Sequence, residues 1–227
     1  MKNSLQSGSL LQLLRIVSPA LPVGAYAGSE GLEYAVEAGW ISNEEQALEW
    51  IGGRLRHSLT HLDIPLLARF QAAWSLDDQA SLDAWSAFLD ASRETSELAA
   101  HDRSLGRALA RLLADLGIER AESLSQQSDV SYVCAFALAT DHWGIDLISS
   151  AHGYLFAWCE SQVAAAVKLI PLGQTQGQRV IGALVGEIPD QVDRGLAISD
   201  SEIGLSEPGL AIASALHETQ YSRLFRS

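Results

Sequence analysis

The chain has 227 residues, with 15 Lys and Arg against 28 Asp and Glu, and therefore a formal net charge of −13. Only 19% of its residues are charged, below the roughly 25% of an average soluble chain, whereas 48% are hydrophobic. This combination argues against disorder, which pairs low hydrophobicity with high charge. It also argues against nucleic-acid binding, because phosphate contacts need a basic surface.

Neither the start of the chain nor its most apolar stretch indicates export or membrane insertion. Residues 1–10 are too polar for a signal peptide. Residues 151–170 are interrupted by polar and charged side chains and therefore predict a buried helix. Cys134 and Cys159 are too few for a disulfide framework. We expect a cytoplasmic protein with no membrane association.

Apolar residues recur at gaps of three and four over most of the chain, which predicts helices. Asn43 is a good N-cap, Asp77 and Asp78 begin another helix, and Gly117 is placed to end a third. No alternating run with an Asn-Gly or Asp-Gly turn indicates a hairpin. We therefore expect an all-α fold with a single domain over 1–227, about ten helices around a central buried helix at 151–170, and flexible residues 1–9. The predicted helices include 44–62 with a break at Pro65, 94–116, 130–139, 144–170, 173–186 and 210–224.

The sequence offers no strong catalytic or metal-binding motif. A nucleophile elbow and a P-loop are both missing, so no catalytic residue and no cofactor are assigned. His57 and His61 lie four residues apart, on one side of a predicted helix. They lack the glutamate of the HExxH pattern and are weak metal-ligand candidates. The alternative interpretation is an ordinary solvated helix face.

A polar pair, His101 and Asp102, interrupts the leucine stripe of the predicted helix 94–116. Polar groups at a core-facing position must be hydrogen-bonded within the chain or must face a partner. Both interpretations stay open at this level. A helical metal-binding protein or enzyme that uses His57, His61 and His101 is therefore an alternative function.

Two segments differ from ordinary packing elements. Residues 18–33, here called the proline–glycine loop, carry two prolines, display Tyr26 and lead into a helix for which Ser29 is the expected cap. Residues 217–227, here called the docking segment, bring Tyr221, Arg223, Phe225 and Arg226 together at the end of an acidic chain. Tyr and Arg dominate binding hot spots. We expect this segment to dock a partner.

Six sequence segments together resemble the UreF family of urease accessory proteins, and the resemblance covers nearly the whole chain. The terminal segment is the most specific of them. They are SPALPVG at 18–24, GLE at 31–33, AVEAG at 35–39, RETSEL at 93–98, KLIPLGQ at 168–174 and HETQYSRLFRS at 217–227. The chain departs from the family pattern at Ala99, where an arginine is usual, and at Ala27 and Gly28, where polar or aromatic residues are usual.

The resemblance implies an all-α, non-enzymatic scaffold for nickel insertion into apo-urease. It implies binding to a UreD/UreH-type accessory protein, recruitment of the GTPase UreG with modulation of its GTP hydrolysis, and a homodimer within the complex. Nickel would be handled by the complex rather than held by this chain. Deleting residues 221–227 is expected to abolish complex formation without unfolding the chain. The implied partner-binding residues are Tyr26, Lys168, His217, Glu218, Tyr221, Arg223, Leu224, Phe225, Arg226 and Ser227.

Overall fold

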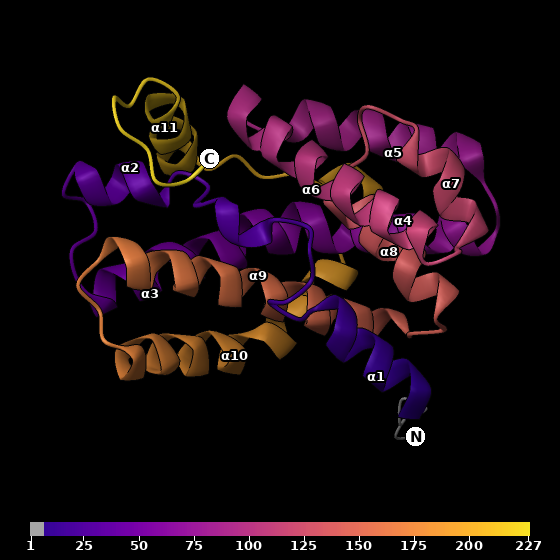
Figure 1. Ribbon diagram of the computed structural model, residues 1–227, viewed down its shortest axis with the longest axis horizontal. Helices are drawn as coiled ribbons and strands as arrows, with labels where there is room; N and C mark the ends of the chain where they lie inside the picture. The colour runs from indigo at the N-terminus through magenta and orange to yellow at the C-terminus, as the bar shows by residue number, and fades with distance from the viewer. Residues whose placement is uncertain (1–6) are drawn as a thin grey trace.

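The computed structural model describes residues 7–227, and this part of the chain is built from helices without a strand (Figure 1). The all-α prediction is therefore confirmed. In the expected flexible segment, residues 7–9 are helical and residues 1–6 lie outside the described residues. The elements are α1 Ser7–Ile16, η1 Ala25–Ala27, α2 Leu32–Glu37, α3 Glu44–Arg54, η2 Leu55–Asp63, α4 Ile64–Ser75, α5 Gln79–Ser92, α6 Ser96–Asp115, α7 Glu119–Ser125, α8 Tyr132–His142, α9 Leu147–Leu169, α10 Gln174–Leu196, η3 Asp200–Glu202 and α11 Pro208–His217.

Local capping explains several of the helix ends. Asn43 accepts the backbone N–H of Gln46 at 3.0 Å at the start of α3, and Asp78 accepts that of Ser81 at 3.1 Å at the start of α5. Both contacts satisfy N–H groups that have no partner inside the helix. Gly117, with φ of 82°, follows α6 in the left-handed conformation that ends many helices. These predicted boundaries are confirmed.

Helix α9 occupies the centre of the fold. It contacts α1, α2, α3, α4, α8, α10, η1 and η2, as the prediction of a central helix at 151–170 required. Figure 1 shows α9 and α10 running side by side, with α4 to α8 gathered at one end and α2, α3 and α11 at the other. Among residues 7–227, no helix combines the length and the apolarity that crossing a bilayer demands. One core of buried apolar side chains reaches from α1 to Phe225.

The predicted break at Pro65 does not occur. Helix α3 continues into the π-helix η2, and α4 follows with Pro65 in its first turn. Pro65 has no N–H to give to the preceding turn, and the carbonyl of His61, four residues earlier, accepts the N–H of Gly204 at 2.8 Å instead. The wider turns of η2 leave room for Thr60 Oγ1 to donate to the carbonyl of Leu55 at 2.7 Å.

The predicted final helix 210–224 is wrong at its C-terminal end, because α11 stops at His217. Leu224 and Phe225 donate their backbone N–H groups to the carboxylate of Glu33, at 2.6 and 2.8 Å, instead of to helical carbonyls. Hydrogen bonds donated to a charged acceptor are stronger than those between neutral groups. The helix therefore gives way to a chain reversal.

Gly106 allows α6 to approach the start of α8. A Cβ at this position would lie 2.1 Å from the carbonyl oxygen of Val130 and 2.5 Å from the carbonyl carbon of Ser131. Alanine favours a helix, but here it must push the two helices apart. We expect Gly106→Ala to lower the free energy of unfolding by about 1–3 kcal/mol, measured by urea denaturation.

Gly182 on α10 provides the matched control, because no heavy atom lies within 4 Å of a Cβ added there. Gly182→Ala is expected to raise the free energy of unfolding by up to about 1 kcal/mol. If Gly106→Ala and Gly182→Ala changed stability alike, the close approach of α6 to α8 would be contradicted.

Candidate functional site

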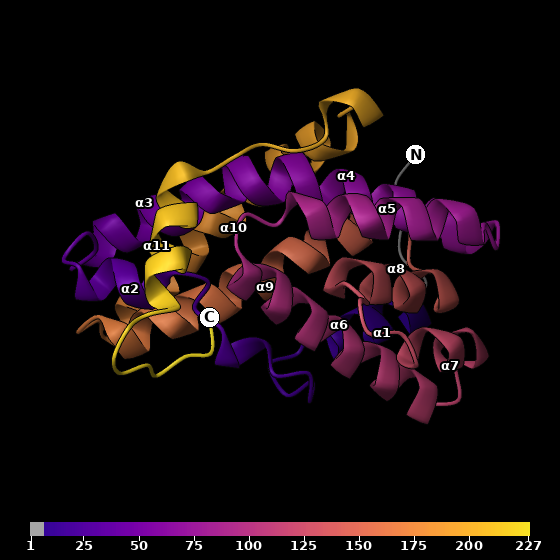
Figure 2. The ribbon, with the colours of Figure 1, turned by 90° about the horizontal axis from the view of Figure 1, so that it is seen from above.

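The docking segment folds back onto the proline–glycine loop (Figure 2). The main-chain oxygen of Ser227 accepts the N–H groups of Ser29 and Glu30, at 2.7 and 2.9 Å. Ser29 Oγ donates to the same oxygen at 2.6 Å, and Arg226 donates its N–H to the carbonyl of Ala27 at 2.8 Å. The two segments that the sequence singled out are thus joined by their backbones.

The predicted cap Ser29 serves two elements at once. Helix α2 begins after Gly31, which adopts the left-handed conformation with φ of 83°, so Ser29 is not the N-cap residue itself. Its Oγ nevertheless accepts the N–H of Glu33 at 3.3 Å while it donates to Ser227. The start of α2 and the end of the chain therefore share one hydroxyl.

His217 lies fully buried between two carboxylates from different helices. Its Nδ1 is 2.9 Å from both carboxylate oxygens of Glu97 on α6, and its Nε2 is 3.2 Å from Glu33 on α2. Arg223 Nη1 lies 3.0 Å from Glu97 as well. Since Glu33 also accepts two backbone N–H groups of the docking segment, these side chains hold the segment against α2 and α6.

The predicted partner-binding residues divide between the interior and the surface. His217, Phe225 and Ser227 are buried within this chain, and Tyr26 is half-buried. Tyr221 is fully exposed and Leu224 is 67% exposed, although both are apolar enough to be buried by a partner. The predicted residues that face solvent are Lys168, Glu218, Tyr221, Arg223, Leu224 and Arg226.

Two aromatic contacts attach this site to the central helix α9. The phenol of Tyr26 donates to Glu160 at 3.2 Å, and burial together with the charge of Glu160 raises the pKa of Tyr26 to about 12. The ammonium of Lys168 lies 5.6 Å from the centroid of the Phe225 ring, a cation–π distance. The loop and the docking segment are therefore both anchored on α9.

Gly28 explains one departure from the family pattern. A Cβ at this position would lie 2.3 Å from the imidazole of His101 and 2.7 Å from Ser227 Oγ. The proline–glycine loop, α6 and the docking segment meet at this point, and only a glycine leaves space for the contact. Of the two interpretations of His101 and Asp102, the structure favours contacts within the chain.

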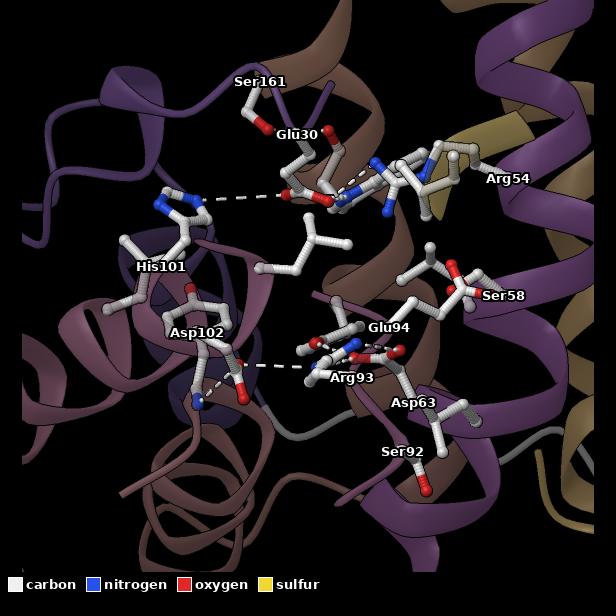
Figure 3. Close-up of a pocket in the computed structure, with 18 of the residues that line it drawn as sticks. Glu30, Arg54, Ser58, Asp63, Ser92, Arg93, Glu94, His101, Asp102 and Ser161 are labelled. Atoms are coloured by element: carbon white, nitrogen blue, oxygen red, sulfur yellow. Dashed lines mark hydrogen bonds and ion pairs between the residues drawn. The ribbon is translucent and has the colours of Figure 1, made fainter. Parts of the chain in front are cut away.

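A cavity of about 90 Å³, lined by both apolar and charged side chains, lies beneath the loop (Figure 3). Arg54 Nη1 is 2.7 Å from Glu30, and the imidazole of His101 lies 4.0 Å from the same carboxylate. Burial by itself raises the pKa of Glu30, but Arg54 and then His101 outweigh this effect and hold the pKa below its ordinary value. Glu30 is therefore a buried carboxylate that stays ionised.

A second ion-pair network follows on the floor of the cavity. Arg93 donates to both oxygens of Asp63, at 3.2 and 2.8 Å, and lies 3.6 Å from Asp102. Tyr154 OH donates to Asp63 at 2.8 Å, and Asp102 accepts the N–H of Tyr132 at 3.1 Å. Burial alone lowers the pKa of Arg93, but Asp63 and Asp102 raise it above its ordinary value. This network connects η2, α6, α8 and α9.

Comparison with known proteins shows which family the chain is related to. The family model described as UreF matches residues 41–185. The urease accessory protein UreF of Alkalilimnicola ehrlichii is 50% identical over 216 residues, which are 95% of each chain. The chain belongs to the UreF family. UreF of Teredinibacter turnerae is 45% identical over 221 residues, 97% of this chain and 100% of that protein. UreF of Marinobacter nauticus is 45% identical over 219 residues, 96% of this chain and 94% of that protein.

The metal-ligand candidates of this UreF-family chain lie away from the docking segment. His57 is exposed on η2, and His61 Nδ1 lies 3.0 Å from the carbonyl oxygen of His57. Across residues 7–227, no three His, Cys, Asp or Glu side chains are grouped so that they could hold a metal ion. Cys134 and Cys159 are free and buried, and burial raises the pKa of each thiol to about 12.

Sequence reasoning missed the two carboxylates that organise the site. Glu33 and Glu97 both lie inside segments that resemble the UreF family, but only as parts of motifs without an assigned role. Each is more than ninety residues from the docking segment that it holds. The available signal was the presence of an acidic residue at a buried helix position, which requires a partner.

Proposed function

We propose that this protein is a non-enzymatic scaffold of urease maturation. It bridges a UreD/UreH-type accessory protein and the GTPase UreG in the cytoplasm, so that nickel enters apo-urease. Membership of the UreF family and the urease accessory role named for its relatives support this proposal. The observation that carries it is the docking segment, which is anchored by its backbone and by the buried Phe225 yet exposes Tyr221 and Leu224 to solvent.

The face proposed for the UreD/UreH-type partner combines α11 with the docking segment. Ile212 and Leu216, one turn apart on α11, are 51% and 40% exposed, and Tyr221 and Leu224 are exposed on the segment that follows α11. Exposed apolar side chains that gather in one region are typical of an interface. Arg223 and Arg226 add positive charge and the residue type that is enriched in hot spots.

UreG is proposed to bind a composite surface of a UreF-type homodimer, near the proline–glycine loop. The contacts of Tyr26 with Glu160 and of Lys168 with Phe225 give this loop and the docking segment one rigid base on α9. A rigid surface loses less conformational entropy on binding. Contact with UreG is also proposed to modulate its GTP hydrolysis, which is testable by adding the purified chain to UreG.

Co-expression tests the proposed function directly. Urease subunits and the other accessory proteins are produced with and without this chain, and urease activity and urease-bound nickel are measured in each case. We expect both quantities to fall to background when the chain is omitted, while the amount of apo-urease stays unchanged. Equal nickel loading with and without the chain would overturn the proposal.

A further inference from the structure

The buried His217 faces a carboxylate from each of its two ring nitrogens. Nδ1 lies 2.9 Å from Glu97 and Nε2 lies 3.2 Å from Glu33. A neutral imidazole has one N–H donor and one lone pair. In this arrangement the lone pair would point at a carboxylate oxygen, whatever the tautomer. The junction therefore needs one proton more than a neutral ring between two carboxylates holds. Both carboxylates already accept from other donors, Glu33 from two backbone N–H groups and Glu97 from Arg223, which favours the second ring nitrogen as the place of this proton.

The charges around His217 lead to the same conclusion. The ionisable groups paired with it come from α2, which supplies Glu33, and from α6, which supplies Glu97, and Arg223 of the docking segment shares Glu97. With an imidazolium the four charges sum to zero. With a neutral ring and both carboxyl groups ionised, the cluster carries one unbalanced negative charge. The side chains of Glu33 and Glu97 are each only 8% exposed, so this charge would lie in the interior. An unpaired buried charge is strongly destabilising.

Neighbouring carboxylates do not replace this pairing. Glu218, the next residue along the chain, is exposed and accepts from Ser96 Oγ at 2.7 Å and from the N–H of Glu97 at 3.2 Å at the start of α6. Gln220 donates to Glu37 on the outer side of α2. Both contacts lie at the surface, so the interior of this junction depends on His217.

The same carboxylate that pairs with His217 holds the chain reversal. Glu33 accepts the N–H groups of Leu224 and Phe225, and Leu224 and Tyr221 are exposed on this reversal. We propose that His217 is the positioning residue of the docking segment: as a buried imidazolium that bridges Glu33 and Glu97, it makes formation of the partner-binding face depend on the uptake of one proton. The partner-binding part of this inference rests on the proposed function.

The direction of the pH dependence follows from the proton count. The docked segment holds a proton that an undocked, solvent-exposed histidine loses above pH about 6.5. Docking is therefore complete at lower pH and weakens as the pH rises, by at most about tenfold per pH unit for one proton. We expect binding of the UreD/UreH-type partner to weaken in the same direction as the pH rises above about 6.5.

Two measurements on the isolated chain test the protonation state without any partner. Nitrogen NMR of the histidine rings, with His217 assigned by its loss in His217→Gln, should show both ring nitrogens protonated at pH 7. The exposed His142 serves as the reference ring. Hydrogen exchange of the Leu224 and Phe225 amides should become about tenfold or more faster in His217→Gln, relative to amides of α9. Circular dichroism establishes that this variant retains its helices.

A binding experiment with the UreD/UreH-type partner compares affinities across pH for the wild-type chain and three variants. His217→Gln should bind weakly at every pH, His142→Gln should follow the wild type, and Glu97→Gln, which removes one of the two carboxylates, should flatten the pH profile. A neutral His217 in a docked segment at pH 7 would overturn the inference and leave the proposed function standing. A protonated His217 in a chain that binds no UreD/UreH-type partner at any pH would support the inference and overturn the proposed function.

Discussion

Replacing Tyr221 and Leu224 together by alanine is expected to lower the affinity for a UreD/UreH-type partner strongly. Exposed apolar anchors at an interface contribute about 2–4 kcal/mol when they are hot spots, which corresponds to a loss of affinity of roughly 30- to 1000-fold. Neither side chain is buried in its own chain, since Tyr221 is fully exposed and Leu224 is 67% exposed. The free energy of unfolding should therefore stay within about 0.5 kcal/mol of the wild type. Titration calorimetry and urea denaturation measure the two quantities.

Leu76→Ala is the matched control, because Leu76 is an exposed apolar residue, 77% accessible, at the end of α4. It should change neither affinity nor stability. An affinity of the Tyr221 and Leu224 double variant within threefold of the wild type would argue against this face. The double variant tests the exposed side chains alone. Deletion of residues 221–227 also removes the buried Phe225 and its hydrogen bond to Glu33. Contrary to the expectation from the sequence, we expect that deletion to destabilise the chain by about 3 kcal/mol or more.

Asp63→Ala is expected to give the largest loss of stability, about 3–5 kcal/mol in the free energy of unfolding. Asp63 is 2% exposed and accepts two bonds from Arg93 and one from Tyr154. Removing the carboxylate of Asp63 takes away the closest counter-ion of the Arg93 guanidinium. Asp102, at 3.6 Å, is then its remaining acidic partner. The loss should appear in urea denaturation as a lower midpoint.

An exposed ion pair provides the comparison for Asp63. Asp90 pairs with Arg103, but its side chain is 48% exposed, so Asp90→Ala should cost no more than about 1 kcal/mol. Asp63→Asn keeps a side chain of similar shape that can still accept from Tyr154, and it should fall between the wild type and Asp63→Ala. Equal stabilities of Asp63→Ala and Asp90→Ala would show that the buried network contributes nothing beyond a surface pair.

The helices of this protein could be predicted because the signals are local. Periodic leucines, the N-caps Asn43 and Asp78 and the terminal Gly117 each act within one or two helical turns. The path through η2 could not be predicted in this way, because Pro65 is equally compatible with a break and with the first turn of a new helix. The continuous packing of η2 against α3, α4 and α10 decides between the two.

The residue types of the candidate site could be predicted from the sequence, but their positions relative to one another could not. Tyr, Arg and Phe near the chain end indicated a binding segment, and the exposed Tyr221 and Leu224 are compatible with that prediction. The burial of His217 and Phe225 was not foreseen, because a terminal helix with a polar end is normally solvated. Their surroundings are provided by Glu33 and Glu97 on separate helices.

The sequence alone therefore establishes the helical class, the family and the two unusual segments, since each follows from short-range periodicity or from recognisable motifs. Only the tertiary structure joins those segments: Ser29 and Ser227, which share a hydrogen bond, are 198 positions apart in the chain. It also determines which charged groups are buried together, such as His217 between Glu33 and Glu97. Such pairings depend on how α2, α6 and α11 pack, and packing is a property of the whole chain rather than of any segment.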